Sequence, residues 1–300
     1  MVPLLFVLGV IAAPLAGQQP TDTIPGTVWT VRDWTILESK VRWGAAQRLD
    51  TLPLGQAIAR LGKTFVGATY TPGTLEVAGP ERVIVNLREL DCVTFIENVL
   101  ALVRFIRNDG VAGLEDPVAA RRQYERYLEA IRYRGGVLDG YPSRLHYFSE
   151  WLADNERRGM LRQLSRSLGG AADAEPISFM TRHTSAYRQL ADGDNLAAIR
   201  RVEAGLNASG PRWFIREASI AKAAPGIRDG DIIAATSTLA GLDVAHTGLA
   251  LWQNGKLHLL HAPLVGRVVE ISEVPLASRI RSIKAQDGIM VARVERLGDR

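Results

Sequence analysis

The sequence contains very little cysteine: Cys92 is the single cysteine among 300 residues. An intramolecular disulfide and a zinc site built on several thiolates are therefore excluded. Beyond the N-terminal segment, no stretch reaches the roughly 20 apolar residues that a membrane-spanning helix needs. Runs of one charge are also missing, and 36 basic against 32 acidic residues leave a formal net charge of +4. This balance gives no support to nucleic-acid binding.

What the chain does contain is apolar mass for a sizeable core. Hydrophobic residues make up 47% of it and charged residues 23%, which excludes intrinsic disorder and a multi-span membrane protein. No repeat or low-complexity tract interrupts it, so one main domain is the simplest division. We place a lead segment at residues 18–49 and this domain at residues 50–300.

The N-terminal segment is apolar from Val2 to about Leu15, ends in the small residues Ala16 and Gly17, and then turns polar. This pattern is typical of a secretory signal peptide, although no Lys or Arg precedes the apolar run. We expect a signal peptide at residues 1–17 and an exported protein, periplasmic or extracellular, with no membrane span. An unpaired cysteine in an oxidising compartment is exposed to oxidation, so its presence calls for a functional reason.

Residues 90–110, "LDCVTFIENVLALVRFIRNDG", form the clearest predicted helix, with Asp91 as its N-cap. Cys92 then lies in the first turn, where the helix dipole and free N–H groups favour a thiolate and lower its pKa. The alternative is that Cys92 is a small hydrophobic core residue. Residues from about 114 to 215 are expected to be helix and loop. Short strands are predicted at residues 229–236, 246–253, 256–264 and 267–274, so the order of elements indicates an α+β fold.

Asn254-Gly255 between two of these strands predicts a hairpin with a two-residue turn. If Gln253 pairs with Lys256, then His246 and His261 become diagonal neighbours on one face, within roughly 7–8 Å. His258 points to the opposite face. Two imidazoles near a cysteine suit a nucleophile, a base and an orienting group, whereas each histidine alone is equally explained by ordinary hydrogen bonding.

Several motifs resemble those of a known family. The chain is similar to NlpC-type papain-like cysteine peptidases and, more closely, to the N-acetylmuramoyl-L-alanine amidase-like family within that superfamily. The similarity runs from about residue 50 to the C-terminus, and "GATYTP" and "HAP" are its small departures. The motifs that carry it are "GTLE", "LDCVTFIENVLAL", "RLHYFSEW", "FMTRH", "GDIIAAT", "GLDVAHTGLAL" and "LLHA".

The resemblance implies a papain-like core, in which an antiparallel sheet packs on the helix bearing the catalytic cysteine, with a helix-rich insertion at about 114–215. It implies cleavage of an amide bond in peptidoglycan or muropeptides, with Cys92 as nucleophile, His246 as base and His261 as orienting residue. No metal or organic cofactor is required.

The same resemblance makes two further segments candidates for lining the substrate groove, although helix packing and surface charge explain them equally well. The residues are Arg144, His146, Tyr147, Arg182 and His183.

Several alternatives stay open. The bond cut is either the amide between N-acetylmuramic acid and L-alanine or the link between γ-D-glutamate and the diamino acid of the stem peptide. A non-catalytic module that binds cell-wall peptides is a third possibility. A metal site made by His246, His261 and a carboxylate is a fourth, and it would leave Cys92 unexplained. The sequence predicts no oligomeric state.

Overall fold

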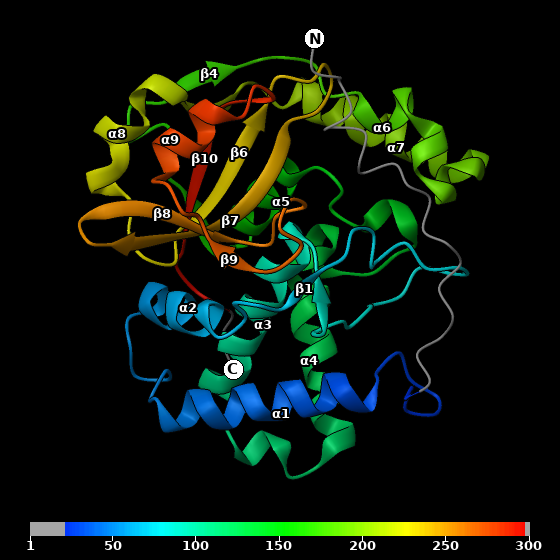
Figure 1. The fold of residues 1–300 in the computed structure, drawn as a ribbon. Coiled ribbons are helices and arrows are strands. Elements are labelled where there is room, and N and C mark those ends of the chain that lie inside the picture. Colours follow the sequence, from blue (N-terminus) through cyan, green and yellow to red (C-terminus); the bar gives the residue numbers. More distant parts are fainter. Residues whose placement is uncertain (1–21, 298–300) are drawn as a thin grey trace.

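The computed structural model describes residues 22–297 (Figure 1). The predicted signal peptide at residues 1–17 lies outside the described residues. The helices are α1 (Val31–Ala46), α2 (Leu54–Lys63), α3 (Cys92–Asn108), α4 (Pro117–Arg132), α5 (Phe148–Arg157), α6 (Phe179–Arg182), α7 (Gly193–Ala208), α8 (Ile220–Ala223) and α9 (Leu276–Ser282). The strands are β1 (Thr69–Tyr70), β2 (Glu89–Leu90), β3 (Leu161–Gln163), β4 (Ala171–Asp173), β5 (Arg212–Arg216), β6 (Ile232–Ser237), β7 (Val244–Gln253), β8 (Lys256–His261), β9 (Glu270–Ile271) and β10 (Gln286–Val294).

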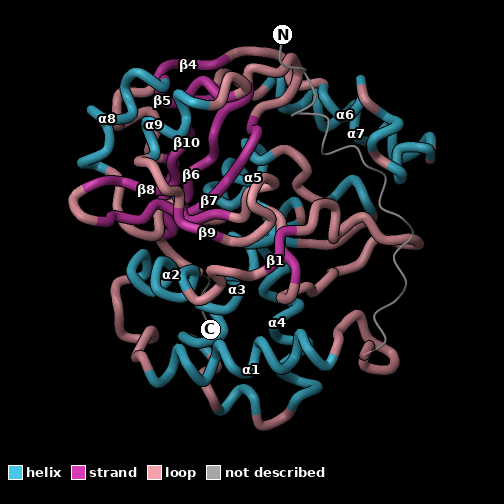
Figure 2. Tube along the Cα trace, in the orientation of Figure 1, coloured by secondary structure: helices cyan, strands magenta, loops and turns pink. Residues whose placement is uncertain are grey.

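The main sheet is antiparallel throughout, with the strand order β4-β5-β10-β6-β7-β8-β9, and β3 also pairs with β10. Figure 2 shows the labelled strands of the main sheet gathered in the upper half of the view and α1–α4 in the lower half. One hydrophobic cluster joins these layers, since it contains Leu37 of α1, Phe95 of α3 and Leu249 of β7. The α+β class predicted from the order of elements is therefore confirmed, and the described part of the lead segment packs into the same core.

The β7–β8 hairpin has the predicted register, with Gln253 opposite Lys256 and Leu249 opposite Leu260. Its turn residues Asn254 and Gly255 have φ angles of 48° and 72°. Two successive positive φ angles define the type of two-residue turn that matches the twist of the strands, and Asn-Gly tolerates them best. A local turn thus determines which side chains of β7 and β8 share a face.

Helix α3 begins at Cys92, as predicted, because Asp91 caps it. The Asp91 carboxylate accepts hydrogen bonds from the N–H groups of Val93 and Thr94, and the Thr94 hydroxyl accepts one from the Asp91 N–H. This reciprocal arrangement satisfies amides that would otherwise lack partners. The start of the helix, and with it the position of Cys92, is therefore well defined.

The expectation of helix and loop alone at residues 114–215 is wrong at β3, β4 and β5, and the sequence pattern also missed β10. Three-residue strands such as β3 and β4 are too short to show a period of two. Strand β10 lies in the interior of the sheet and is buried at most positions, so it shows no alternation of apolar and polar residues. The 114–215 segment consequently contributes strands to the main sheet as well as helices.

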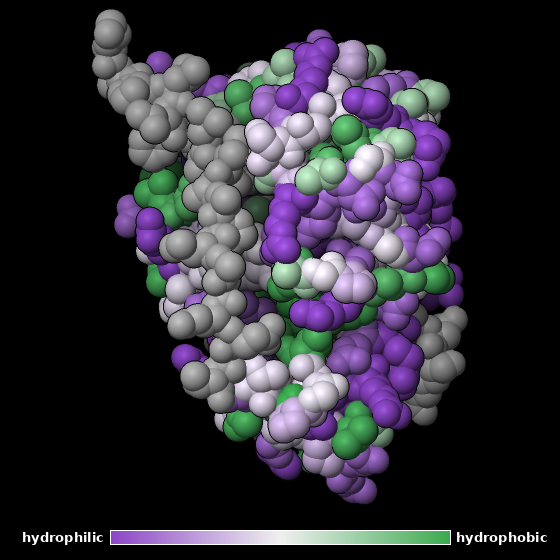
Figure 3. All heavy atoms as spheres, turned by 90° about the vertical axis from the view of Figure 1, so that its right-hand side faces the viewer, coloured by the Kyte–Doolittle hydropathy of each residue, from purple (hydrophilic) through white to green (hydrophobic). Residues whose placement is uncertain are grey.

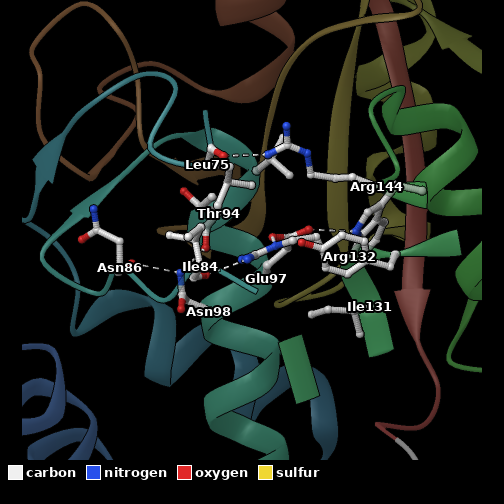
Figure 4. A network of polar contacts seen from close by, with 12 residues as sticks. Leu75, Ile84, Asn86, Thr94, Glu97, Asn98, Ile131, Arg132 and Arg144 are labelled. Atoms are coloured by element: carbon white, nitrogen blue, oxygen red, sulfur yellow. Dashed lines mark hydrogen bonds and ion pairs between the residues drawn. The ribbon is translucent and has the colours of Figure 1, made fainter. Parts of the chain in front are cut away.

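A buried polar network ties the loop before α3 to the helices around it (Figure 4). The Arg132 guanidinium donates to the Glu97 carboxylate at 2.7 Å and to the carbonyl of Ile84 at 2.7 Å. Asn98 donates to the carbonyl of Asn86 at 3.3 Å. Because these partners come from α3, α4 and the loop, they position the chain that leads into Cys92.

On the face in Figure 3, hydrophilic side chains predominate among the visible described residues, and hydrophobic ones form smaller groups between them. Large exposed hydrophobic residues such as Val31, Val137 and Val265 are far apart in the sequence. Within residues 22–297, no helix is both long enough and apolar enough to cross a membrane.

Candidate active site

The Cys92 thiol lies where α3 meets β7. The Thr247 hydroxyl of β7 donates a hydrogen bond of 2.8 Å to the carbonyl oxygen of Cys92. The thiol itself lies within hydrogen-bonding reach of the hydroxyl and the backbone N–H of Thr247. Since consecutive Cα atoms are about 3.8 Å apart, this contact also holds the backbone of His246, one residue earlier, close to the start of α3.

His246 and His261 are in direct contact, as the hairpin register predicts. His246 Nε2 lies 2.8 Å from His261 Nδ1, and the two rings meet nearly perpendicular to each other with centroids 4.9 Å apart. His258 points to the other face of β8, where its Nδ1 contacts the carbonyl oxygen of Ser272 at 2.8 Å. The structure therefore separates one histidine pair, which includes the residue before Thr247, from a third histidine with a structural hydrogen bond.

Both histidines of the pair are neutral at ordinary pH. Burial lowers the pKa of His246 well below its usual range, and His261 and Arg279 act in the same direction. Burial and Arg279 lower the pKa of His261 to about 3. Neutral imidazoles can accept a proton, which is what a general base must do.

The pKa of Cys92 differs from the sequence-based expectation. Burial and the adjacent Asp91 carboxylate raise the pKa of the thiol to about 11, although hydrogen bonds from Thr247 and from the N–H of Cys92 oppose this. The helix N-terminus favours a thiolate, but Asp91 has already used two of its N–H groups, and the carboxylate adds a negative charge beside the sulfur. The resting site thus contains a neutral thiol.

Tyr70 is a candidate site residue that the sequence reasoning missed. Burial raises its pKa, and the electrostatic influence of Cys92 and Asp91 acts in the same direction, so the phenol lies near the thiol. Strand β1 pairs with β2, which leads into Cys92, and the Tyr70 N–H donates to the carbonyl of Arg267. The sequence feature that could have indicated it is the tyrosine in "GATYTP", about twenty residues before Cys92.

Arg144 is not free in this structure. Its side chain is 5% exposed and donates to the carboxylate of Glu76 and, at 3.1 Å, to the carbonyl of Leu75. Its Nε lies 3.6 Å from Glu81 Oε1. Arg144 therefore holds the 73–81 loop, and a substrate contact by this residue stays a prediction.

The other four predicted substrate residues also lie outside the Cys92–His246–His261 group. His146 Nε2 contacts the carbonyl oxygen of Tyr141 at 3.0 Å, and burial lowers its pKa well below the usual range. The Tyr147 hydroxyl donates to Glu203, and His183 Nδ1 contacts the carbonyl oxygen of Phe179. Arg182 is exposed at the end of α6. Their roles toward substrate stay predictions.

Neither a metal site nor the large cavity involves the predicted catalytic residues. In the described part of the chain, no three His, Cys, Asp or Glu side chains gather as a metal site would require. A cavity of about 910 Å³ is lined by residues of α5, α7 and β5, including Glu150, Val202 and Trp213. None of the three predicted catalytic residues lines it.

The fold and the site define an α+β protein in which an antiparallel sheet carries a histidine pair, and the strand that holds His246 is bonded through Thr247 to the start of a helix that begins at cysteine. The chain belongs to the AmiA-like family, described as N-acetylmuramoyl-L-alanine amidase-like, whose family model matches residues 60–289.

Solved structures agree with this assignment. A crystal structure of an N-acetylmuramoyl-L-alanine amidase from Bacteroides uniformis is 34% identical, with a TM-score of 0.73, over 81% of this chain and 99% of that chain. A candidate xylanase from Bacteroides fragilis is also 34% identical, with a TM-score of 0.69, over 78% of this chain and 98% of that chain. A Legionella pneumophila protein that is 20% identical, with a TM-score of 0.60, covers 87% of this chain and 95% of its own, and it shares the fold. No functionally curated protein matches the chain.

Proposed function

We propose that the protein is a cysteine-dependent peptidoglycan hydrolase that cleaves the amide between N-acetylmuramic acid and L-alanine. The observation that carries this proposal is the 2.8 Å contact between His246 and His261. His246 lies on β7, and the next residue of that strand, Thr247, bonds to the carbonyl oxygen of Cys92. This arrangement supplies a nucleophile, a base and an orienting group. Family membership supports the choice of substrate. We further propose that the core is papain-like and that the enzyme acts outside the cytoplasm.

The neutral resting site determines the order of the chemical steps. Cys92 Sγ attacks the amide carbonyl carbon while His246 Nδ1 takes the thiol proton, because the thiol is not ionised beforehand. His246 then passes this proton to the nitrogen of the leaving amine, and the C–N bond breaks. Water, deprotonated by His246, attacks the thioester and releases the acid and the free thiol.

The developing oxyanion needs donors, and the capping of α3 limits which ones remain. Asp91 occupies the N–H groups of Val93 and Thr94, whereas the N–H of Cys92, which contacts its own thiol in the resting site, is the first donor that we assign to the oxyanion. The Tyr70 hydroxyl, kept protonated near the thiol, is the second donor that we assign. Donors placed in advance at the oxyanion stabilise the transition state.

A carboxylate of the stem peptide requires a cation that is not already paired. Among the described residues, Arg182 is exposed and has no ion-pair partner, whereas Arg144 is bound to Glu76. We therefore assign the contact with a peptide carboxylate to Arg182, with His183 beside it. Arg144, His146 and Tyr147 shape the groove indirectly, through the loops and helices that they hold.

Mass spectrometry of the reaction products tests the proposal. Purified peptidoglycan and defined muropeptides are incubated with the wild type and with Cys92→Ala. We expect free stem peptides that begin with L-alanine, formed by the wild type alone. L-Ala-γ-D-Glu fragments would instead establish an endopeptidase, and no cleavage by the folded wild type would support a binding module.

Histidine variants separate the roles within the site. His246→Ala is expected to nearly abolish turnover, and His261→Ala to reduce it less, because His261 acts through His246. His258→Gln is the matched control, since His258 lies on the opposite face of β8. Full activity of Cys92→Ala would disprove the assignment of the nucleophile.

A further inference from the structure

His261 has one ring nitrogen without a hydrogen-bond partner. Its side chain is only 1% exposed, and its Nδ1 is occupied by His246 Nε2. The other nitrogen, Nε2, is buried and makes no hydrogen bond among the described residues. A carboxylate oxygen of Glu270 lies 3.7 Å from it. The β8–β9 register places Glu270 directly opposite His261, so the backbone itself maintains this proximity.

The hydrogen bond between the two histidines can run in either direction. If His246 Nε2 donates to His261 Nδ1, then His246 Nδ1 is unprotonated and serves as the base, and His261 carries its proton on Nε2. If His261 Nδ1 donates instead, His246 carries its proton on Nδ1 and cannot accept one from the thiol. Only the first direction is competent for the proposed reaction.

We propose that Glu270 is a positioning residue that sets the direction of the His246–His261 hydrogen bond. This inference rests on the proposed function. A carboxylate near Nε2 attracts an N–H and repels a lone pair, so it favours the state in which His261 is protonated on Nε2. The 3.7 Å separation exceeds a normal hydrogen bond, but the Glu270 side chain is 40% exposed and retains room to approach.

The charges around the pair fit this role. Three groups face His261: His246 from β7, Glu270 from β9 and Arg279 from α9. Glu273 in turn raises the pKa of Glu270. Arg279 disfavours a second proton on either histidine, and Glu270 in turn acts on Arg279. Glu270 thus determines where the single proton of His261 resides, while burial and Arg279 together keep His261 neutral.

No proton is transferred to Glu270 in the reaction. The thiol proton moves to His246 Nδ1, His246 Nε2–H continues to donate to His261 Nδ1, and His261 Nε2–H points toward the Glu270 carboxylate. The carboxylate remains ionised and stabilises the imidazolium of His246 through the intervening ring.

The test compares Glu270→Ala and Glu270→Gln with Glu273→Ala, which removes a nearby exposed carboxylate. We expect Glu270→Ala to lower kcat about tenfold with KM nearly unchanged. Glu270→Gln keeps an acceptor oxygen and is expected to restore part of kcat. Wild-type kcat in Glu270→Ala, an equal loss in Glu273→Ala, or an effect confined to KM would overturn the proposal.

A second readout does not depend on activity. Nitrogen-15 NMR of the histidine rings, with His261 assigned through His261→Gln, reports which ring nitrogen carries the proton. We expect the wild type to show His261 protonated on Nε2, and Glu270→Ala to populate the other tautomer of both rings. An unchanged tautomer in Glu270→Ala refutes the role of Glu270. Failure of the wild type to cleave muropeptides refutes the proposed function instead.

Discussion

Thr247 donates its hydroxyl proton to the carbonyl oxygen of Cys92 over 2.8 Å, and the two residues are 155 positions apart in the sequence. This hydrogen bond joins the helix that carries the proposed nucleophile to the strand that carries the proposed histidine base. It also brings the Thr247 hydroxyl within reach of the thiol.

Removal of the Thr247 hydroxyl should therefore affect both stability and turnover. Thr247→Val keeps the shape of the side chain but leaves the buried contact without its donor, at a cost of about 1–2 kcal/mol in the free energy of unfolding. We expect a reduced kcat as well, because the histidine strand is less firmly held against α3. Urea denaturation and muropeptide turnover measure the two effects. Thr247→Ser, which keeps the hydroxyl, should lie close to the wild type, and equal losses in both variants would contradict this account.

The ionisation of Cys92 can be followed by its rate of alkylation. With a thiol pKa of about 11, the thiolate fraction rises steadily with pH and is only about one part in ten thousand at neutral pH. We expect the rate with iodoacetamide to increase about tenfold per pH unit between neutral pH and about pH 10. A rate that reaches a plateau below pH 7 would instead reveal a preformed thiolate–imidazolium pair.

The assignment of Tyr70 as an oxyanion donor predicts a specific kinetic effect. Tyr70→Phe should lower kcat by about ten- to a hundredfold and leave KM nearly unchanged, since the donor acts mainly in the transition state. Tyr127→Phe serves as the control, because the Tyr127 hydroxyl binds Asp109 at the end of α3, far along the helix from Cys92. A change confined to KM would indicate that Tyr70 contacts bound substrate instead.

The buried ion pair between Arg132 and Glu97 should contribute far more to the free energy of unfolding than an exposed ion pair does. Both side chains of Arg132–Glu97 are 2% exposed, and burial raises the pKa of Glu97 against the effect of Arg132. Arg132→Ala leaves the Glu97 carboxylate without its partner and should cost about 3–5 kcal/mol in the free energy of unfolding. Arg162→Ala breaks a pair whose side chains are 55% and 43% exposed, and should cost no more than about 1 kcal/mol. Similar losses in both variants, measured by chemical denaturation, would disprove this ranking.

Acid should destabilise the fold partly through His261. Its folded pKa of about 3 lies below the ordinary value of 6.5, so the unfolded chain binds a proton first as pH falls. The contribution of neutral His261 to the free energy of unfolding is therefore complete above pH 6.5 and is lost between pH 6.5 and about pH 3. The free energy of unfolding falls by up to about 1.4 kcal/mol per pH unit in this range.

His261→Gln removes this proton uptake. The difference in unfolding free energy between the wild type and His261→Gln should therefore shrink between pH 7 and pH 5. Urea denaturation at several pH values measures it, and a difference independent of pH would show that His261 is not buried in its neutral form.

The sequence by itself determined the features that depend on neighbouring residues. The Asn254-Gly255 turn allows only a narrow choice of register, so the shared face of His246 and His261 follows from local geometry. The start of α3 at Cys92 follows in the same way from the capping side chain of Asp91.

Only the tertiary structure decided the features that distant segments create together. Strand β10 is an interior strand because it meets β6 and β5, and burial on both faces removes the alternation that would have marked it. The thiol pKa of Cys92, the proximity of Tyr70 and the position of Glu270 beside His261 likewise depend on contacts between segments far apart in the chain. Burial and electrostatic environment are properties of the packed fold, and local sequence patterns do not contain them.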